Sequence, residues 1–177
     1  MVARIDELAV VHTTARIGEG VAIGPFAVIG PYVTIGDGCA VGPGVNIAST
    51  RMGPGCQVGP NTIIGGEPQI IDWLAVQSWV TLGANVKINE LVTIHRSMYE
   101  NGETIIGDNS YIMAQAHIGH DCKLGEGVVM TSLAGFSGHV EVGKNAVIGG
   151  AAVAHQHVRI GEMAMVGGLS RLVQDVP

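Results

Sequence analysis

The segment AHIGHDC at residues 116–122 gathers side chains that could do chemistry. His117 and His120 are three residues apart, and Asp121 follows His120 directly. A histidine beside a carboxylate is held in one tautomer and becomes a better base, which is the logic of a catalytic dyad. Neutral imidazoles are also the commonest metal ligands in proteins. The segment therefore indicates a general base, a metal site or simple packing, and its position in the fold must decide among the three.

A repeat of six residues sets that position. Aliphatic side chains recur at residues 5, 11, 17, 23, 29, 35, 41 and 47, and the same period runs unbroken from Ile106 to Leu172, with a few non-branched residues. A period of six fits neither an α-helix nor a simple amphipathic strand, but it is typical of hexapeptide solenoids, which are parallel β-helices. Three hexads make one triangular coil of about 18 residues with aliphatic side chains inside. The sequence therefore predicts an all-β fold, a single solenoid domain of about nine coils over residues 1–177.

Two stretches break the period, at about residues 65–81 and 97–105. They do not fit the wall of a coil, so we expect both to loop out from it. Loops that leave a rigid scaffold often carry binding residues.

The coil length predicts that six polar side chains form one cluster over three successive coils. These are His117, His120, Asp121, His139, His155 and His157. Residues 18 apart in sequence lie in one column, so Asp121, His139 and His157 should follow one another at one outward corner. The same count leaves only His12 and His95 elsewhere.

A zinc site of the kind found in trimeric hexapeptide carbonic anhydrases is the alternative to a general base. Those enzymes carry an HxxxxH pair with one further histidine, whereas this chain has HxxH at 117–120 and HxH at 155–157. In addition, Gly138 beside His139 could offer a backbone N–H to a developing oxyanion. These observations favour acid–base catalysis, and we expect no bound metal.

Composition and charge restrict the possible settings of this chemistry. The net charge of −6 argues against nonspecific nucleic-acid binding. The sequence contains no run of about 18 apolar residues, so it predicts no membrane span. The opening MVARIDELAV is too short and too charged for a signal peptide, and the three cysteines form no CxxC pair. We therefore expect a cytoplasmic protein.

Several segments together resemble one enzyme family. They are VHTTARIGEGVAIGPFAVIGP at 11–31, VTIHR at 92–96, AHIGHDC at 116–122, GHVEVG at 138–143 and IGGAAVAHQ at 148–156. The chain resembles UDP-N-acetylglucosamine acyltransferases, the family that begins lipid A synthesis. The resemblance implies a left-handed β-helix, a homotrimer with active sites between adjacent subunits, and no cofactor. It also implies transfer of an acyl group, such as 3-hydroxyacyl, from an acyl carrier protein to UDP-N-acetylglucosamine.

The resemblance further implies roles for individual residues. His120 would be the general base, Asp121 would orient it, and the Gly138 N–H would stabilise the oxyanion. Gly168 matches the position that limits acyl length in this family. The positions that match contacts to the acceptor sugar, its phosphates or the pantetheine arm are His117, His139, His155, Gln156, Gln69 and Gly150.

Some positions depart from the family pattern. The family usually reads QDLKY where residues 69–73 here read QIIDW, so Ile70 replaces an Asp and Asp72 replaces a Lys. An anion at that point would repel a diphosphate, so another nucleotide sugar, for example an amino-bearing one, is an alternative acceptor, with acyl-coenzyme A as an alternative donor. His157 replaces a usual phenylalanine. Family members ordinarily continue after QDVP with a helical region, so we expect this sequence to be either a naturally short form or a truncated one.

Overall fold

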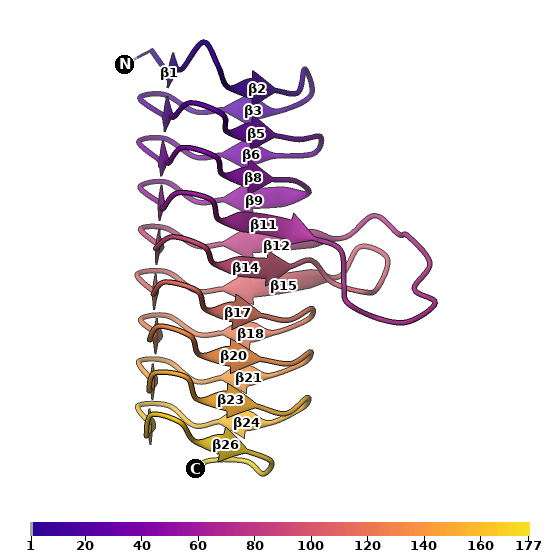
Figure 1. The fold of residues 1–177 in the computed structure, drawn as a ribbon, viewed down its shortest axis with the longest axis vertical. Helices are drawn as coiled ribbons and strands as arrows, with labels where there is room; N and C mark the ends of the chain where they lie inside the picture. Colours follow the sequence, from indigo (N-terminus) through magenta and orange to yellow (C-terminus); the bar gives the residue numbers. More distant parts are fainter. Residues whose placement is uncertain (1) are drawn as a thin grey trace.

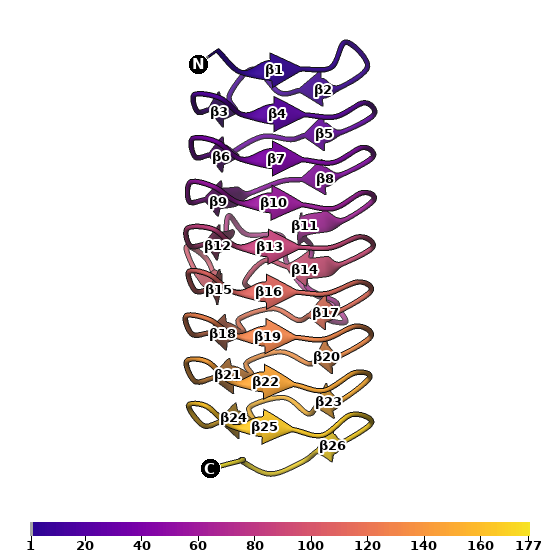
Figure 2. The ribbon, with the colours of Figure 1, turned by 90° about the vertical axis from the view of Figure 1, so that its left-hand side faces the viewer.

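The computed structural model describes residues 2–177, which form 26 short strands and no helix. The strands wind into a left-handed β-helix whose coils stack along one axis (Figure 1). They build three parallel sheets, here called A, B and C, which form the three walls of the prism (Figure 2). The expected fold class is therefore confirmed.

Each wall takes one strand from every coil. Sheet A contains β1 (Arg4–Ile5), β4 (Ala22–Ile23), β7 (Ala40–Val41), β10 (Gln57–Val58), β13 (Lys87–Ile88), β16 (Tyr111–Ile112), β19 (Val129–Met130), β22 (Val147–Ile148) and β25 (Met165–Val166). Sheet B contains β2 (Val10–Val11), β5 (Val28–Ile29), β8 (Asn46–Ile47), β11 (Ile63–Gly66), β14 (Thr93–His95), β17 (His117–Ile118), β20 (Gly135–Phe136), β23 (Val153–Ala154) and β26 (Arg171–Leu172). Sheet C contains β3 (Arg16–Ile17), β6 (Thr34–Ile35), β9 (Thr50–Met52), β12 (Trp79–Leu82), β15 (Glu103–Ile106), β18 (Lys123–Leu124), β21 (Glu141–Val142) and β24 (Arg159–Ile160).

The core is filled by two side chains from each hexad. In the hexad around β4, Val21 is 0% exposed and Ile23 is 3% exposed, whereas Ala22 between them faces outward. This is the ordinary alternation of a strand, confined to three residues. Repeated in each coil, it stacks columns of Ile and Val into one continuous core. Burial of these aliphatic columns is the main source of stability for the solenoid.

Three corners join the walls. Corner AB leads from sheet A to sheet B (24–27 in one coil), corner BC from B to C (30–33), and corner CA from C back to A (36–39). Coils approach very closely here: a Cβ added to Gly36 would lie 2.7 Å from the backbone of Gly53 in the next coil. Glycine directly after the aliphatic residue is therefore a packing requirement at this corner.

Two loops project from corner BC on the same side of the prism (Figure 1). Residues 67–78 connect β11 to β12, and residues 96–102 connect β14 to β15. Within the predicted stretches of about 65–81 and 97–105, Gly66 and residues 79–81 and 103–105 still pair with neighbouring strands. Beyond each loop the columns resume in register: Ile64 pairs with Ile94, and Ile94 pairs with Ile118.

Within residues 2–177, no helix could cross a membrane.

We predict that truncating one core isoleucine destabilises the whole solenoid. Ile148 is fully buried, so Ile148→Ala should lower the free energy of unfolding by about 2–5 kcal/mol. Ile71, which is 91% exposed on the first loop, provides the matched control, and Ile71→Ala should change it by less than about 0.5 kcal/mol. Urea denaturation followed by circular dichroism measures both. Equal effects of the two substitutions would contradict the assignment of the core.

Candidate active site

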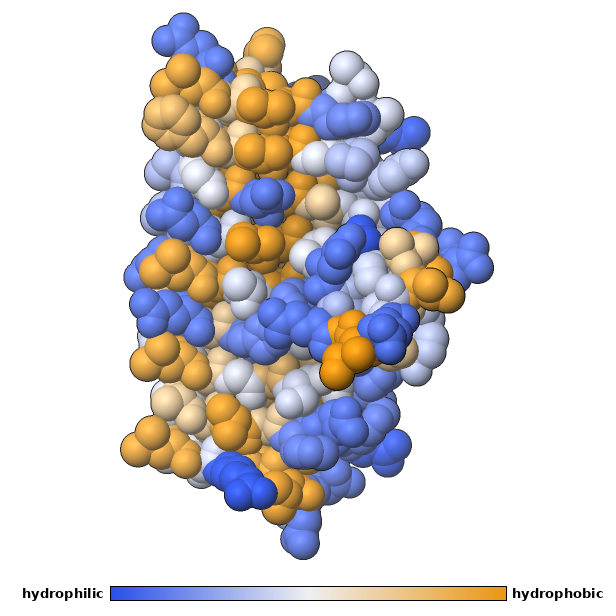
Figure 3. Space-filling view, turned by 45° about the vertical axis from the view of Figure 1, so that its right-hand side comes forward, coloured by the Kyte–Doolittle hydropathy of each residue, from blue (hydrophilic) through white to orange (hydrophobic). Residues whose placement is uncertain are grey.

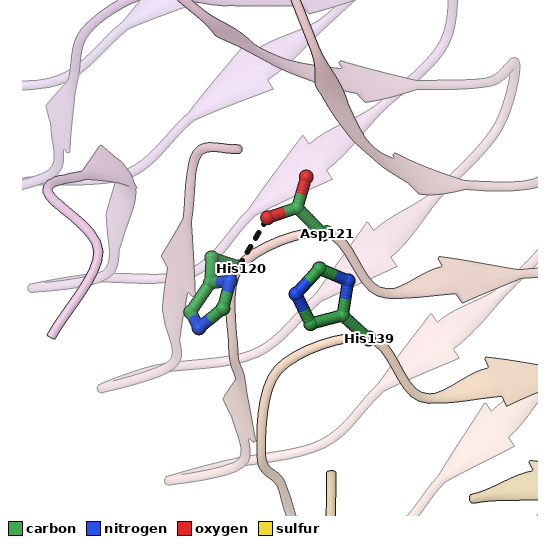
Figure 4. A group of neighbouring side chains, drawn as sticks. All are labelled: His120, Asp121 and His139. Carbon is green, nitrogen blue, oxygen red and sulfur yellow. Dashed lines mark hydrogen bonds and ion pairs between the residues drawn. The ribbon is translucent and has the colours of Figure 1, made fainter. Parts of the chain in front are cut away.

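His120 and Asp121 form a hydrogen-bonded dyad at corner BC, between β17 and β18 (Figure 4). The Nδ1 atom of His120 lies 2.9 Å from Oδ2 of Asp121, and the two side chains are 16% and 10% exposed. A carboxylate can only accept at this contact, so Nδ1 carries the proton. The lone pair of His120 then resides on Nε2, which is the arrangement that a general base requires.

The carboxylate of Asp121 is itself held by the second loop. Ser97 Oγ donates to Oδ1, and the Met98 N–H donates to Oδ2 at 3.0 Å. The backbone N–H of Asp121 donates to Thr104 Oγ1 at 2.8 Å. Both carboxylate oxygens therefore accept hydrogen bonds, which fixes the orientation of the carboxylate toward His120. Sequence reasoning missed Ser97 and Met98, although a loop leaving corner BC one coil before Asp121 was a signal for them.

Gly138 lies directly against the base. A Cβ at this position would collide with the imidazole ring of His120, so only glycine lets the ring occupy its place. The same position in five other hexads, two residues after the aliphatic residue, is taken by proline: Pro25, Pro31, Pro43, Pro54 and Pro60. Proline has no N–H, so the coil does not need a donor there. The coil therefore does not require a hydrogen bond from the Gly138 N–H, which is available to a ligand.

A cavity of about 660 Å³ opens in front of the dyad, over sheet B. Its walls include the predicted residues His117, His120, Gly138, Gln156 and Gln69. Gly135 in β20 has no side chain and lies among the lining residues, so this part of the wall is open to a ligand. The structure thus brings five of the predicted site residues around one concave surface.

His95 belongs to this cavity, so the expectation that it lies elsewhere was wrong. Its ring centroid is 4.9 Å from that of His117, and both residues line the cavity. The column count failed because the second loop lengthens one coil: Ile94 pairs with Ile118, which is 24 residues later rather than 18. Only a count that leaves out the six extra residues of the loop places His95 beside the segment at 116–122.

Two histidines of the cavity, His95 and His117, are kept neutral by their surroundings. Burial, reinforced by the nearby His117 and His120, lowers the pKa of His95 to about 4. Burial also lowers the pKa of His117, whose Nδ1 lies 2.8 Å from Thr93 Oγ1. Neutral imidazoles can both donate and accept hydrogen bonds, which suits the hydroxyl and amide groups of a sugar.

His139 and His157 lie behind the dyad and continue its column. The rings of His120 and His139 meet edge to face at 5.1 Å, and His157 stacks on His139 at 4.6 Å. Both line a second cavity of about 350 Å³ that also contains Lys123 and Arg159. Burial lowers the pKa of His139, partly opposed by Asp121.

Three predicted residues lie outside both cavities. His155 lines a smaller one of about 160 Å³ that adjoins the main cavity at Ser137. Gly150 and Gly168 are exposed on corner AB, at the far edge of sheet B, where they stack on each other in successive coils. The predicted single cluster is thus divided, and His155 is apart from the ring cluster.

The first loop meets the cavity through Gln69, Ile70 and Ile71. Asp72 is exposed and does not line the cavity. The expected repulsion between Asp72 and a diphosphate in this cavity therefore has no geometric basis within residues 2–177.

A metal ion would have to compete with the dyad. His120, Asp121 and His139 each offer one ligand atom, and these atoms lie within 4.8 Å of one another. However, Nδ1 of His120 already pairs with Asp121, and both oxygens of Asp121 accept hydrogen bonds from Ser97 and Met98. The arrangement fits an oriented base better than an open coordination site.

We predict that His95 makes stability pH-dependent. Its folded pKa of about 4 is below the ordinary value of 6.5, so between these values the unfolded chain binds more protons. The stabilisation is complete above pH 6.5 and is lost as pH falls towards 4, by at most about 3 kcal/mol. His95→Asn should flatten the pH dependence of the urea midpoint, whereas His12→Asn, at an exposed site, should preserve it. A steep dependence that persists in His95→Asn would refute the assignment.

Two family models match this chain. Residues 5–101 match the GMPPB C-terminal domain and belong to that domain family. Residues 103–137 match the bacterial transferase hexapeptide model of six repeats.

Relatives with curated names are similar over much of the chain. An acyl-(acyl-carrier-protein)–UDP-N-acetylglucosamine O-acyltransferase of Thermodesulfovibrio yellowstonii is 45% identical over 140 residues, which are 78% of this chain and 54% of that protein. A protein of the same name from Burkholderia ambifaria is 43% identical over 115 residues, or 64% of this chain and 44% of that protein. The chain therefore spans about half the length of the curated relatives that it matches.

Solved structures are similar over almost the whole chain. A UDP-N-acetylglucosamine acyltransferase from Campylobacter jejuni superposes with a TM-score of 0.94 at 37% identity, covering 98% of this chain and 68% of that one. A UDP-N-acetylglucosamine acyltransferase from Bacteroides fragilis gives 0.95 at 34% identity with the same coverage. Fold, repeat and sequence agree, and this chain belongs to the UDP-N-acetylglucosamine acyltransferase family of hexapeptide-repeat β-helices.

Proposed function

We propose that this chain transfers an acyl group from a thioester donor to a hydroxyl or amine of a UDP-N-acetylglucosamine-like sugar. One observation carries the proposal: the paired His120 faces a cavity beside the unused N–H of Gly138. A base and an oxyanion donor side by side are what acyl transfer to a hydroxyl needs. The names of the relatives describe the same reaction, O-acylation of UDP-N-acetylglucosamine from an acyl carrier protein.

The reaction can be written on the residues of the dyad. Nε2 of His120 takes the proton of the acceptor hydroxyl while the oxygen attacks the carbonyl carbon of the thioester. The carbonyl oxygen becomes anionic and accepts the N–H of Gly138. As the C–S bond breaks, the leaving thiolate takes the proton back from His120. The products are an ester and a free thiol, and Asp121 stabilises the transient imidazolium.

Different parts of the substrate are assigned to different groups of surrounding residues. We assign the acceptor sugar to the main cavity, where His117, Gln69 and Gln156 offer hydrogen bonds. We assign polar groups of the substrate to the second cavity with His139, because both basic and acidic side chains line it, among them Lys123 and Glu103. The positions beyond these cavities are left for the acyl and pantetheine parts of the donor. They are His155, Gly150 and Gly168.

The donor is a thioester of an acyl carrier protein, with acyl-coenzyme A as the alternative, and no bound cofactor takes part. Every step above uses side chains or backbone of this chain. We place the reaction in the cytoplasm, because Cys39, Cys56 and Cys122 are buried free thiols, and such thiols are typical of a reducing compartment.

The active form is a homotrimer in which corner AB faces the symmetry axis. This corner carries an exposed apolar ridge with exposed fractions between 48% and 84%. Its members are Leu8, Phe26, Leu91, Leu133 and Leu169. Figure 3 shows apolar residues at intervals along one edge of the molecule, whereas polar residues gather on the side that carries the loops. An apolar surface of this extent is typical of an interface, and cyclic closure avoids open-ended assembly.

The flanking walls support the same orientation. The outward residues of sheet A are largely small or apolar. They include Ala22, Ala40, Val129, Val147 and Met165. The outward residues of sheet C are largely charged. They include Arg16, Arg51, Lys123, Glu141 and Arg159. With corner AB inside, sheet A of one subunit would cover sheet B of its neighbour, and the main cavity would lie between subunits.

We predict that light scattering finds a particle of about 55 kDa, three times the chain mass of 18.3 kDa. Leu133→Asp places a charge in the ridge and should give monomers, because burying an unpaired carboxylate is costly. Met163 is 71% exposed on corner CA, so Met163→Asp should leave the trimer intact. A wild-type monomer at micromolar concentration would contradict the trimer and the shared active site.

We predict that His120→Ala lowers turnover by about 10² to 10⁴, the usual contribution of a positioned general base. Asp121→Ala should cost less, because it removes orientation and charge support but leaves the imidazole. The substrates come from a screen of acyl-carrier-protein and coenzyme A thioesters against nucleotide sugars. His12→Ala, outside both cavities, controls for nonspecific effects.

Two outcomes of that screen would overturn the proposal. Full turnover in His120→Ala on a confirmed substrate would refute the base assignment. Loss of activity with a chelator and recovery with zinc would favour the metal reading, which the neighbouring ligand atoms of His120, Asp121 and His139 make testable.

A further inference from the structure

The peptide unit between Ser97 and Met98 is held at both ends. Its N–H, from Met98, donates to Oδ2 of Asp121 at 3.0 Å. Its carbonyl oxygen, from Ser97, accepts a hydrogen bond of 2.5 Å from Ser78 Oγ. Because a peptide unit is planar, fixing its carbonyl also fixes the direction of its N–H. The donor that holds Asp121 is thus aimed by Ser78, a fully buried residue at the end of the first loop.

The next peptide unit is held by the first loop as well. Nε1 of Trp73 donates to the carbonyl oxygen of Met98 at 3.1 Å. The Trp73 ring is in turn covered by the guanidinium of Arg96, whose carbon lies 5.3 Å from the ring centroid. Arg96 also donates to Ser49 Oγ at 3.3 Å, which ties this group to the wall of the solenoid. Trp73 is therefore fixed on both sides, by a hydrogen bond and by cation–π packing.

These contacts form one chain of hydrogen bonds from the first loop to the base. Trp73 holds Met98, the Met98 N–H holds Asp121, and Asp121 holds Nδ1 of His120. The two hydrogen bonds of Met98 lie on the two peptide units that share its Cα, so Trp73 acts on Asp121 by fixing the backbone position of Met98. Ile70 and Ile71, three and two residues before Trp73, line the main cavity, whereas Trp73 does not. The segment that meets the substrate and the segment that sets the dyad are thus only two residues apart.

We propose that Trp73 is a positioning residue that couples the first loop to the orientation of the His120–Asp121 dyad. When the loop is seated, Trp73 Nε1 keeps Met98 in place, and the Met98 N–H keeps Asp121 aligned with His120. A substrate that settles Ile70 and Ile71 into the cavity settles the same loop. Trp73 acts through Met98 and Asp121 and does not touch the reacting atoms.

The test compares the two tryptophans of the chain. Trp73→Phe keeps an aromatic ring against Arg96 but removes the N–H. Trp79→Phe is the matched control, because Trp79 lies on sheet C against Arg51 and Tyr32, away from the dyad. Since this inference rests on the proposed acyl transfer, one readout must not depend on activity. That readout is the downfield proton NMR signal of the His120 Nδ1–H, which a bond to Asp121 protects from exchange.

We expect Trp73→Phe to lower kcat about two- to tenfold, the contribution of one hydrogen bond, with the acceptor KM unchanged. It should also broaden the Nδ1–H signal, whereas Trp79→Phe should alter neither. In an Asp121→Asn background, Trp73→Phe should have no further effect on kcat, because the two act in one chain. If Trp73→Phe does not fold, Ser78→Ala loosens the same segment from its other end and should produce the same pattern.

The proposal is overturned if Trp73→Phe and Trp79→Phe give the same kcat and the same Nδ1–H signal. It is also overturned if Trp73→Phe changes only the acceptor KM, because that would make Trp73 a binding residue. A wild-type chain that transfers no acyl group to any acceptor would refute the proposed function instead. The NMR comparison would then still decide whether Trp73 positions the dyad.

Discussion

The fold depends on a left-handed backbone turn that recurs at the corners of the prism. With only six residues for a strand and a turn, the third residue after most aliphatic positions takes a positive φ, as Asp121 does at 61° and His139 at 63°. Glycine adopts this conformation freely and asparagine tolerates it, whereas other side chains adopt it at a cost of about 1–2 kcal/mol. The residue type at each corner therefore shows whether the position was filled by a residue that favours the turn or by one with another role.

The three corners differ in the residue types at their positive-φ positions. Corner CA uses residues that suit the turn, and only its last member, Met163, departs from glycine and asparagine. They are Gly20, Gly38, Gly55, Asn85, Asn109, Gly127 and Asn145. Corner AB carries bulky apolar residues at the same positive φ, including Phe26, Leu91, Leu133 and Leu169. Corner BC carries Asp121, His139 and His157. Backbone strain is accepted at the two corners to which we assign assembly and chemistry, and it is avoided at the third.

The six-residue repeat determines how much of the structure can be predicted from the sequence. It gave the fold, the inward columns and the place of Asp121, His139 and His157, because each depends only on counting hexads. It failed where the count was interrupted. His95 was placed elsewhere because one coil has 24 residues, and Ser97 and Met98 were missed because a loop has no period to place its side chains. Loop contacts depend on the whole structure, so no local pattern could supply them.

Electrostatics explains why the presence of His95 in the main cavity is compatible with His120 as the base. His120 must become an imidazolium during the proposed transfer, and a neighbouring positive charge would oppose that step. Burial lowers the pKa of His95 to about 4 and also lowers the pKa of His117, so both stay uncharged beside the base at neutral pH. Asp121, with both oxygens bonded, supplies the compensating negative charge at 2.9 Å. The cavity can therefore offer polar imidazoles to a ligand without placing further positive charge beside the base, because desolvation removes their charge and leaves their hydrogen bonds.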